Sequence, residues 1–279
     1  MKFLESAQLK TGEYREFSAG DLRIATSLEK RANAKRLTVV LNGYCDRGSN
    51  VPPVFVSWPE GGEAYGHILR ICDPTLLMAD WLRGSCFLGT ESADPLPPII
   101  AVCRQLATDL GVSPRDILYI GHSGAGFGAL RSAILDGEAA ALGINPVAEI
   151  SAYSEYQFAA RLARVFRPGS SAAALCAEFP ERFSISACLK PALAAGKAPR
   201  MALLQNVTDK NHFHSHYGAV CRALGIPESG GSDLSGRFHS VTYDKRGGHS
   251  MPPEMSLIEA MAERLLAGDR AMLASAKAS

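Results

Sequence analysis

The sequence lacks the features that mark several large classes of protein. No stretch approaches the roughly 18 consecutive apolar residues that span a bilayer. The 29 Lys and Arg are balanced by 28 Asp and Glu, which gives a formal net charge of +1, and no block of basic residues stands out. Binders of nucleic acid or of anionic membranes usually depend on long-range electrostatic attraction, which this balance does not provide. We therefore expect no nucleic-acid partner and no membrane span.

Cysteine is present, but not in a pattern that builds a disulfide framework or a structural zinc site. The seven cysteines are an odd number, and no two of them form a C-x-x-C pair. Near the start of the chain, Glu5 places an acid where a signal peptide needs its apolar segment. The simplest interpretation is a cytoplasmic protein with reduced thiols.

The remaining composition is that of an ordinary globular domain, with 279 residues of which 47% are hydrophobic and 20% charged. Short apolar runs alternate with helical patterns, which is typical of an α/β protein with a mostly parallel sheet. Buried strands are predicted at 37–41, 67–72, 117–120, 140–144, 201–207 and 240–243. Helices are predicted at 98–110, 127–135 and about 253–266.

Between two of these strands lies a long segment with a mostly helical pattern. It runs from Asn145 to Pro199, about fifty residues, which is more than a simple crossover connection needs. We therefore divide the chain into a core made of residues 1–146 and 200–279 and a helical cap inserted as residues 147–199.

The clearest motif follows the strand at 117–120, where the chain reads Gly121-His122-Ser123-Gly124-Ala125-Gly126. This is close to G-x-S-x-G, in which a serine sits on a sharp turn between a strand and a helix. The neighbours of that serine must be small because the strand and the helix approach each other there, and Ala125 meets this need. The helix N-terminus points toward the serine, where negative charge develops during acyl transfer. Ser123 is therefore a candidate nucleophile.

Two other interpretations of this glycine-rich turn stay open. Such a turn also serves simply to pack a helix tightly on a sheet. Alternatively, Gly124, Gly126 and Gly128 cluster where a dinucleotide-binding fingerprint would lie. The spacing does not match G-x-G-x-x-G, and the strand lies in the middle of the chain, so dinucleotide binding is disfavoured.

A serine hydroxyl needs a base, and the base needs a partner that fixes its tautomer. Asp209 follows the strand at 201–207, and His249 lies in a Gly-Gly-His-Ser turn after the strand at 240–243. The chain order of serine, acid and histidine is the one described for α/β-hydrolases. Asp244, which lies five residues before His249, is an alternative acid.

With these residues the chain resembles the α/β-hydrolase superfamily, from the strand at Leu37 to the terminal helix. The resemblance implies an α/β-hydrolase fold, with a mostly parallel central sheet flanked by helices and a helical cap inserted late in the chain. It also implies that Ser123 is the nucleophile, His249 the general base and then acid, and Asp209 the orienting carboxylate.

The resemblance further implies an oxyanion hole made of backbone N–H groups. One belongs to Gly124, the residue after the nucleophile, and the other to Tyr44, in the turn after an early strand. That turn has Asn42-Gly43 where many members of the superfamily have His-Gly. Asp73 is ambiguous, because it follows a strand where it would either contact substrate or cap a turn, and His122 is a contact or a packing residue. The candidate substrate contacts are Asn42, Gly43, Asp73 and His122.

Three histidines, His212, His214 and His216, alternate in the segment after Asp209. Alternation places them on one side if the segment is extended, which invites a metal-binding interpretation. No carboxylate or cysteine completes a recognisable ligand spacing, so we expect no metal site. A solvated helix start or a substrate-facing loop is favoured instead.

The expected activity is hydrolysis of a carboxylic ester, on a small-molecule or glycan-linked substrate and without a cofactor. Two alternatives stay open: an acyltransferase that moves an O-acyl group to or from a glycan with the same triad, and a non-catalytic scaffold. Asp73-Pro74-Thr75 and Gln205-Asn206-x-x-Asp209 also resemble segments of bacterial hydrolase-like proteins associated with cell-surface glycans, which bears on the substrate class.

Overall fold

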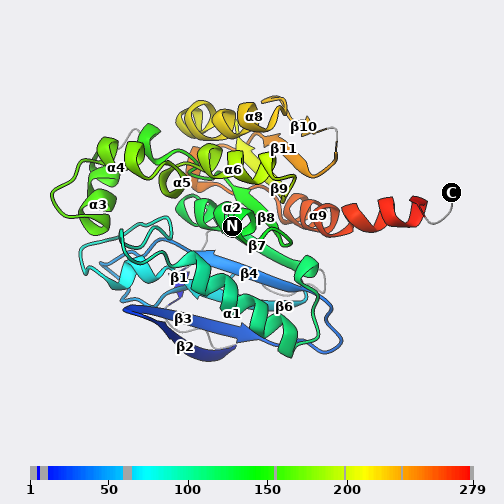
Figure 1. Cartoon of the computed structure of the whole chain (residues 1–279), viewed down its shortest axis with the longest axis horizontal. Helices are drawn as coiled ribbons and strands as arrows, with labels where there is room; N and C mark the ends of the chain where they lie inside the picture. Colours follow the sequence, from blue (N-terminus) through cyan, green and yellow to red (C-terminus); the bar gives the residue numbers. More distant parts are fainter. Residues whose placement is uncertain are drawn as a thin grey trace.

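A nine-stranded, mostly parallel sheet forms the centre of the molecule (Figure 1). The computed structural model describes residues 5–6, 12–58, 65–153, 156–197, 199–233 and 235–276. The strand order is β10-β11-β9-β8-β7-β4-β6-β3-β2, with β1 and β5 forming a separate antiparallel pair. The strands are β1 (Glu5–Ser6), β2 (Glu13–Ala19), β3 (Leu22–Glu29), β4 (Leu37–Asn42), β5 (Phe55–Val56), β6 (His67–Cys72), β7 (Ile117–His122), β8 (Ala140–Ile144), β9 (Arg200–Asn206), β10 (Gly231–Ser232) and β11 (Phe238–Tyr243).

Helices flank the sheet and connect its parallel strands. The α-helices are α1 (Leu96–Asp109), α2 (Gly124–Asp136), α3 (Tyr156–Phe166), α4 (Ala172–Glu178), α5 (Pro180–Phe183), α6 (Ile185–Ala194), α7 (Lys210–His212), α8 (Gly218–Leu224) and α9 (Met255–Ala276). Short helical turns are η2 (Pro74–Leu77), η3 (Pro114–Asp116), η4 (Ile150–Ala152), η5 (Phe213–Tyr217) and η6 (Gly248–Ser250).

The six predicted strands all form, and they are the six that run parallel to one another: β6, β4, β7, β8, β9 and β11. Strands β4, β6, β8 and β9 are buried at every residue. A parallel strand covered by helices on both faces reads as a continuous apolar run, which is why these runs predicted strands correctly. The predicted mostly parallel sheet is confirmed.

The side chains of each strand alternate between two hydrophobic cores, one on each face of the sheet. Tyr119 of β7 joins the core that includes α1, α2 and α6. Its neighbours Leu118 and Ile120 face the opposite core, in which they meet Ile258 and Met261 of α9. Burial on both faces holds β7 rigidly in the middle of the sheet, so the turn at its carboxyl end has a fixed position.

The segment at 147–199 is helical, as its pattern predicted. Helix α6 packs against α2 and α8, in the helical layer that covers the sheet. Helix α3 carries Phe158, whose ring lies 3.0 Å from the position that a Cβ on Gly84 would take. The division of the chain at residues 147 and 199 stays a prediction.

The sequence patterns did not indicate the antiparallel hairpin of β2 and β3, which forms one edge of the sheet. Most of β2 is exposed, so it lacks the apolar run that marks a central strand. Helix α9 also extends to Ala276, ten residues beyond the predicted end at 266. Among the described residues, no helix has the length and apolar character needed to cross a bilayer.

Replacement of Gly121 by alanine is expected to destabilise this framework. A Cβ at Gly121 would lie 2.1 Å from the carbonyl oxygen of Ala125, which is backbone and has no room to move. We expect Gly121→Ala to lower the free energy of unfolding by about 1–3 kcal/mol or more, measured by urea denaturation.

Gly48→Ala is the matched control for that substitution. Gly48 is exposed, and a Cβ there would meet Asp46 Oδ1 at an ordinary 3.5 Å. Its free energy of unfolding should change by less than about 0.5 kcal/mol. Equal unfolding midpoints for the two variants would contradict the close approach of β7 and α2.

Candidate active site

Ser123 occupies a strained turn between β7 and α2. Its backbone has φ 57° and ψ −124°, a positive φ that residues other than glycine seldom adopt. Hydrogen bonds hold this conformation: the Ser123 N–H donates to the Ile144 carbonyl at 3.0 Å, and the Val147 N–H donates to the Ser123 carbonyl at 3.0 Å. Such strain persists where the surroundings enforce it, and here it presents the hydroxyl at the carboxyl edge of the sheet.

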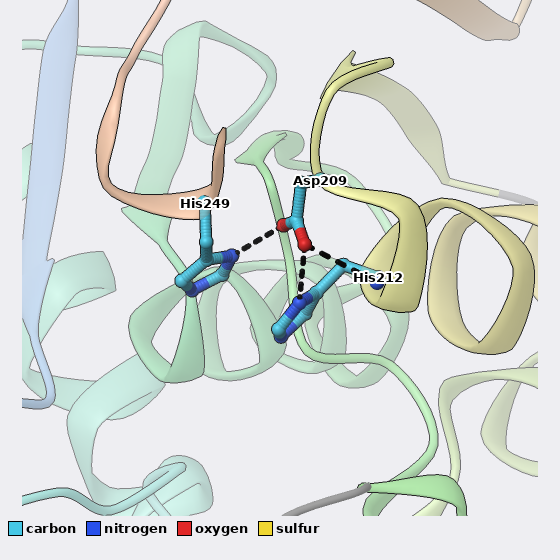
Figure 2. A group of neighbouring side chains, drawn as sticks. All are labelled: Asp209, His212 and His249. Carbon is cyan, nitrogen blue, oxygen red and sulfur yellow. Dashed lines mark hydrogen bonds and ion pairs between the residues drawn. The ribbon is translucent and has the colours of Figure 1, made fainter. Parts of the chain in front are cut away.

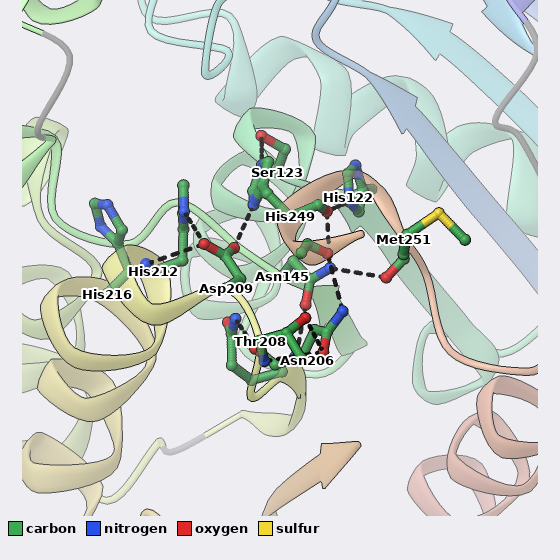
Figure 3. A network of polar contacts seen from close by, with 12 residues as sticks. His122, Ser123, Asn145, Asn206, Thr208, Asp209, His212, His216, His249 and Met251 are labelled. Atoms are coloured by element: carbon green, nitrogen blue, oxygen red, sulfur yellow. Dashed lines mark hydrogen bonds and ion pairs between the residues drawn. The ribbon is translucent and has the colours of Figure 1, made fainter. Parts of the chain in front are cut away.

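The structure brings together the three side chains that the sequence singled out (Figure 3). His249 Nε2 lies 2.7 Å from Ser123 Oγ, and His249 Nδ1 lies 2.7 Å from Asp209 Oδ2. A carboxylate accepts hydrogen bonds, so Nδ1 is the protonated nitrogen of a neutral His249. Nε2 is then left to accept the hydrogen bond from the serine hydroxyl.

The geometry also distinguishes between the two candidate acids. Asp209 is 8% exposed and lies three residues beyond the end of β9, where its carboxylate meets His249. Asp244 is exposed, one residue beyond β11. Asp209 is therefore the carboxylate that can orient the imidazole.

Two buried asparagines hold the loop that carries His249, a role that the sequence analysis assigned to neither. The Asn145 amide donates to the carbonyls of His249 at 2.9 Å and Met251 at 3.3 Å. The Asn206 amide donates to the carbonyls of Lys245 at 2.8 Å and Gly248 at 2.9 Å. Both asparagines are 0% exposed. Asn145 directly follows β8 and Asn206 ends β9, so the sheet itself sets the position of the His249 loop.

His122 supports the same loop from the other side of the elbow. Its Nε2 lies 2.9 Å from the His249 carbonyl oxygen and must donate to it. Burial, followed by the proximity of His249, lowers the pKa of His122 to about 3. The residue is therefore neutral near pH 7, and its ring forms part of the wall of the cleft beside Ser123.

A second imidazole shares the Asp209 carboxylate (Figure 2). His212 Nδ1 lies 3.1 Å from Asp209 Oδ1, the oxygen that His249 does not use. The rings of His212 and His249 stack, with centroids 3.8 Å apart and planes inclined by 20°. Burial alone would raise the pKa of Asp209, but the hydrogen bonds from His212 and His249 outweigh it and hold that pKa below its ordinary value.

Asp209, His212 and His249 have the residue types of a metal site, and their ligand atoms lie within 4.8 Å of one another. A zinc ion lies about 2.0–2.1 Å from each imidazole nitrogen, in the plane of the ring. The two rings here are stacked in nearly parallel planes, so their lone pairs cannot converge on one ion without a rearrangement. The geometry favours a shared carboxylate over a metal centre.

The predicted oxyanion turn lies against the elbow. A Cβ on Gly43 would meet the Ser85 carbonyl oxygen at 2.7 Å and the Ala125 nitrogen at 3.2 Å, so only glycine allows this contact. The Tyr44 N–H donates to Asn42 Oδ1 at 3.4 Å, and the Asn42 amide donates to the Val54 carbonyl at 3.1 Å. These bonds fix the turn beside Ser123.

Asp73 is the one candidate substrate contact that the structure places elsewhere. It is 0% exposed and does not line the cleft. Its carboxylate accepts hydrogen bonds from the Thr75 N–H at 2.8 Å, the Ser85 hydroxyl at 2.5 Å and the Phe87 N–H. The prediction that Asp73 contacts substrate is thus corrected, and the alternative prediction, that it caps a turn, describes its position. It caps a turn and anchors the segment that packs on Gly43 and Gly124.

A cleft of about 890 Å³ opens over Ser123. Tyr153 and Phe158, from the segment at 147–199, line its wall, and their rings pack at a tilt of 36° with centroids 4.6 Å apart. The predicted site residues that line it are Asn42, Gly43, Tyr44, His122, Ser123, Gly124 and His249.

Comparisons with known proteins identify the fold. No protein-family model and no curated protein sequence matches the chain. A solved capsule O-acetyltransferase of Neisseria meningitidis serogroup A is similar over 89% of this chain and 91% of its own, with a TM-score of 0.57 at 14% identity. FphF, a fluorophosphonate-binding serine hydrolase of Staphylococcus aureus, is similar over 92% of this chain and 99% of its own, with a TM-score of 0.55 at 13% identity.

A 2,6-dihydroxy-pseudo-oxynicotine hydrolase is similar over 92% of this chain and 69% of its own, with a TM-score of 0.61 at 13% identity. At these identities the similarity concerns the backbone. The chain has the α/β-hydrolase fold, as the sequence predicted.

Asp209→Asn is expected to abolish most activity while leaving the fold intact. An amide would hold His249 in the wrong tautomer, and in such a triad this costs about 10⁴-fold in kcat. Asp244→Asn is the matched control and should stay within about twofold of the parent, because its exposed side chain lies outside the site. If the measured rate of ester cleavage falls for Asp244→Asn and not for Asp209→Asn, Asp244 is the carboxylate that orients His249.

A chelator should leave the activity unchanged. After dialysis against EDTA we expect ester cleavage within about twofold of the untreated rate, since the stacked rings do not form a converging ligand set. Activity that is lost on dialysis and restored by zinc would show that the site binds a metal.

Proposed function

We propose that the protein is a serine acyl hydrolase that cleaves carboxylic esters through Ser123, His249 and Asp209. The observation that carries the proposal is the continuous hydrogen-bonded chain from Asp209 to Ser123, with both contacts to His249 at 2.7 Å. A serine is a useful nucleophile only with a base in this position, and a base holds the right tautomer only with such a partner.

In this mechanism His249 Nε2 takes the hydroxyl proton while Ser123 Oγ forms a bond to the ester carbonyl carbon. The resulting imidazolium is stabilised by Asp209. His249 then gives the proton to the departing alkoxide, which leaves an acyl group on Ser123. Water, deprotonated by the same His249, attacks this acyl-enzyme and releases the acid, so the enzyme returns to its initial protonation state.

The negative charge of the tetrahedral intermediate requires hydrogen-bond donors near Ser123. We assign this role to the backbone N–H groups of Gly124, at the start of α2, and of Tyr44, which would exchange its 3.4 Å hydrogen bond to Asn42 Oδ1 for one to the oxyanion. Both residues line the cleft with Ser123, and the Gly43 turn packs directly on the elbow. Loss of one such donor costs about 3 kcal/mol of transition-state stabilisation.

Acyl transfer is the second candidate. It is favoured by the similarity to a capsule O-acetyltransferase over nearly the full length of both chains. The same acyl-enzyme would then be attacked by the hydroxyl of an acceptor. That acceptor would be a small molecule or a glycan bound in the cleft. The choice depends on whether water or the acceptor reaches Ser123 first.

The chemistry proposed needs no cofactor, since all proton transfers are assigned to residues of the chain. The seven cysteines are all free, and six of them are buried. Free thiols support the proposed cytoplasmic location.

The decisive experiment is labelling with a fluorophosphonate probe, which reacts with activated serines. We expect one label per chain in the parent and none in Ser123→Ala. Addition of a glycan acceptor with an activated ester separates the two candidates, because a transferase forms acylated glycan faster than free acid. A parent chain that takes no label would favour the non-catalytic scaffold.

A further inference from the structure

The mechanism above leaves one buried group of the site without a role. His212 is 8% exposed and belongs to the helical turn α7, three residues after Asp209. Its Nδ1 donates to Asp209 Oδ1, while its Nε2 is buried without a hydrogen-bond partner among the described residues. A buried nitrogen without a partner opposes folding, so packing alone does not account for a histidine here.

We propose that His212, in its neutral form, is a positioning residue for the catalytic pair Asp209 and His249. The proposal rests on the proposed function. His212 would act on the reaction in two ways: it fixes the orientation of the carboxylate, and it presents an uncharged ring face to the imidazolium that forms on His249.

The first action follows from how the carboxylate is shared. Asp209 Oδ2 accepts from His249 at 2.7 Å, and Oδ1 accepts from His212 at 3.1 Å and from the His212 backbone N–H at 3.4 Å. Rotation of the carboxylate would break bonds on both sides. With His212 in place, Asp209 Oδ2 stays in line with His249 Nδ1 while His249 Nε2 takes up and releases the proton of Ser123.

The second action follows from the stacking of the two rings. Their centroids are 3.8 Å apart, so the positive charge that His249 gains in the transition state faces the π-system of His212. A cation over a neutral aromatic face is stabilised. A proton on His212 would instead place two cations face to face and divide the charge of Asp209 between them, which opposes proton transfer from Ser123.

The ring of His212 also packs on a second histidine. On one side, His216 of η5 lies 4.7 Å away between ring centroids and accepts the N–H groups of Ala148 and Glu149 on its Nδ1. Burial, followed by the nearby His212 and His249, lowers the pKa of His216 to about 3, so this ring is neutral.

The rest of the His212 side chain contacts Tyr153, Asp209 and His249. The Tyr153 ring packs edge-on at 5.5 Å, Asp209 supplies the negative charge, and the His249 ring covers one face. Behind His249 lies the neutral His122. Asp209 thus supplies the negative charge of this cluster, and two of its rings, His122 and His216, are neutral near pH 7.

Substitutions at His212 can separate the two actions. Asparagine places an amide donor where the Nδ1–H of histidine lies but cannot take a proton. Phenylalanine keeps the ring without the donor. His214→Asn is the matched control, because His214 lies two residues away in the same segment and is exposed.

The test compares kcat, KM and thermal unfolding of these variants on an activated aryl ester. His212→Phe should lower kcat by about 10- to 100-fold with KM unchanged, as expected when a group acts only in the transition state. His212→Asn should keep kcat within about tenfold of the parent, and His214→Asn should match the parent.

The order of the two variants provides a readout that a purely structural role would not give. If His212 only fills space, His212→Asn, which loses the ring, should lose at least as much kcat as His212→Phe. A positioning role predicts the opposite order, because the amide donor of His212→Asn still holds the Asp209 carboxylate. Expressing kcat per chain that takes the fluorophosphonate label keeps the comparison valid even if part of His212→Phe unfolds.

The outcomes distinguish this inference from the proposed function. An active parent whose His212→Phe variant folds and keeps the parental kcat, or whose His212→Asn variant loses at least as much kcat as His212→Phe, overturns the role of His212 alone. A parent that neither cleaves the ester nor takes the fluorophosphonate label refutes the proposed function and, with it, this inference.

Discussion

The hydrogen bond between His249 and Asp209 constrains the architecture around it, because it joins two loops that leave neighbouring parallel strands. β9 and β11 are paired in register from Phe238 opposite Met201 to Tyr243 opposite Asn206. Their carboxyl ends therefore lie side by side, and Asp209 and His249 need only short loops to meet. β7 ends at the same edge two strands away, where the strained turn raises Ser123 toward the same imidazole.

Buried polar side chains at the ends of these strands fix the loops that carry the site residues. Asn145 directly follows β8 and Asn206 ends β9, and their amides bind the backbone of the loop that carries His249. Asp73 does the same for the segment beside the predicted oxyanion turn. A buried amide or carboxylate left unpaired is costly, so these residues favour a single arrangement of the loops. The geometry of the candidate site is thus held by hydrogen bonds to the backbone as well as by those among Ser123, His249 and Asp209.

The central strands and the three triad candidates could be predicted because their signals are local. A strand buried on both faces is an apolar run, and a G-x-S-x-G-like turn, an acid and a histidine each follow such a run in a known order. The edge hairpin was missed because β2 is largely exposed. Asn145 and Asn206 were visible at strand ends, but their partners lie about forty or a hundred residues away, as Asn206 with Gly248 and Asn145 with His249 show.

The three alternating histidines show how the period of a segment decides which side chains meet. An extended segment would place His212, His214 and His216 on one side. The segment is helical instead, so His212 and His216, four residues apart, share a face while His214 is exposed. The helical period also places His212 one turn after Asp209, which is how it reaches that carboxylate.

The central claim is that Ser123 carries the acyl group during turnover. Rapid quenching of the parent with an activated ester, followed by intact and peptide mass spectrometry, tests it directly. The account predicts one acyl group per chain, located on the peptide that contains Ser123. Turnover without an adduct, or with the acyl group on another residue such as a cysteine, would contradict it.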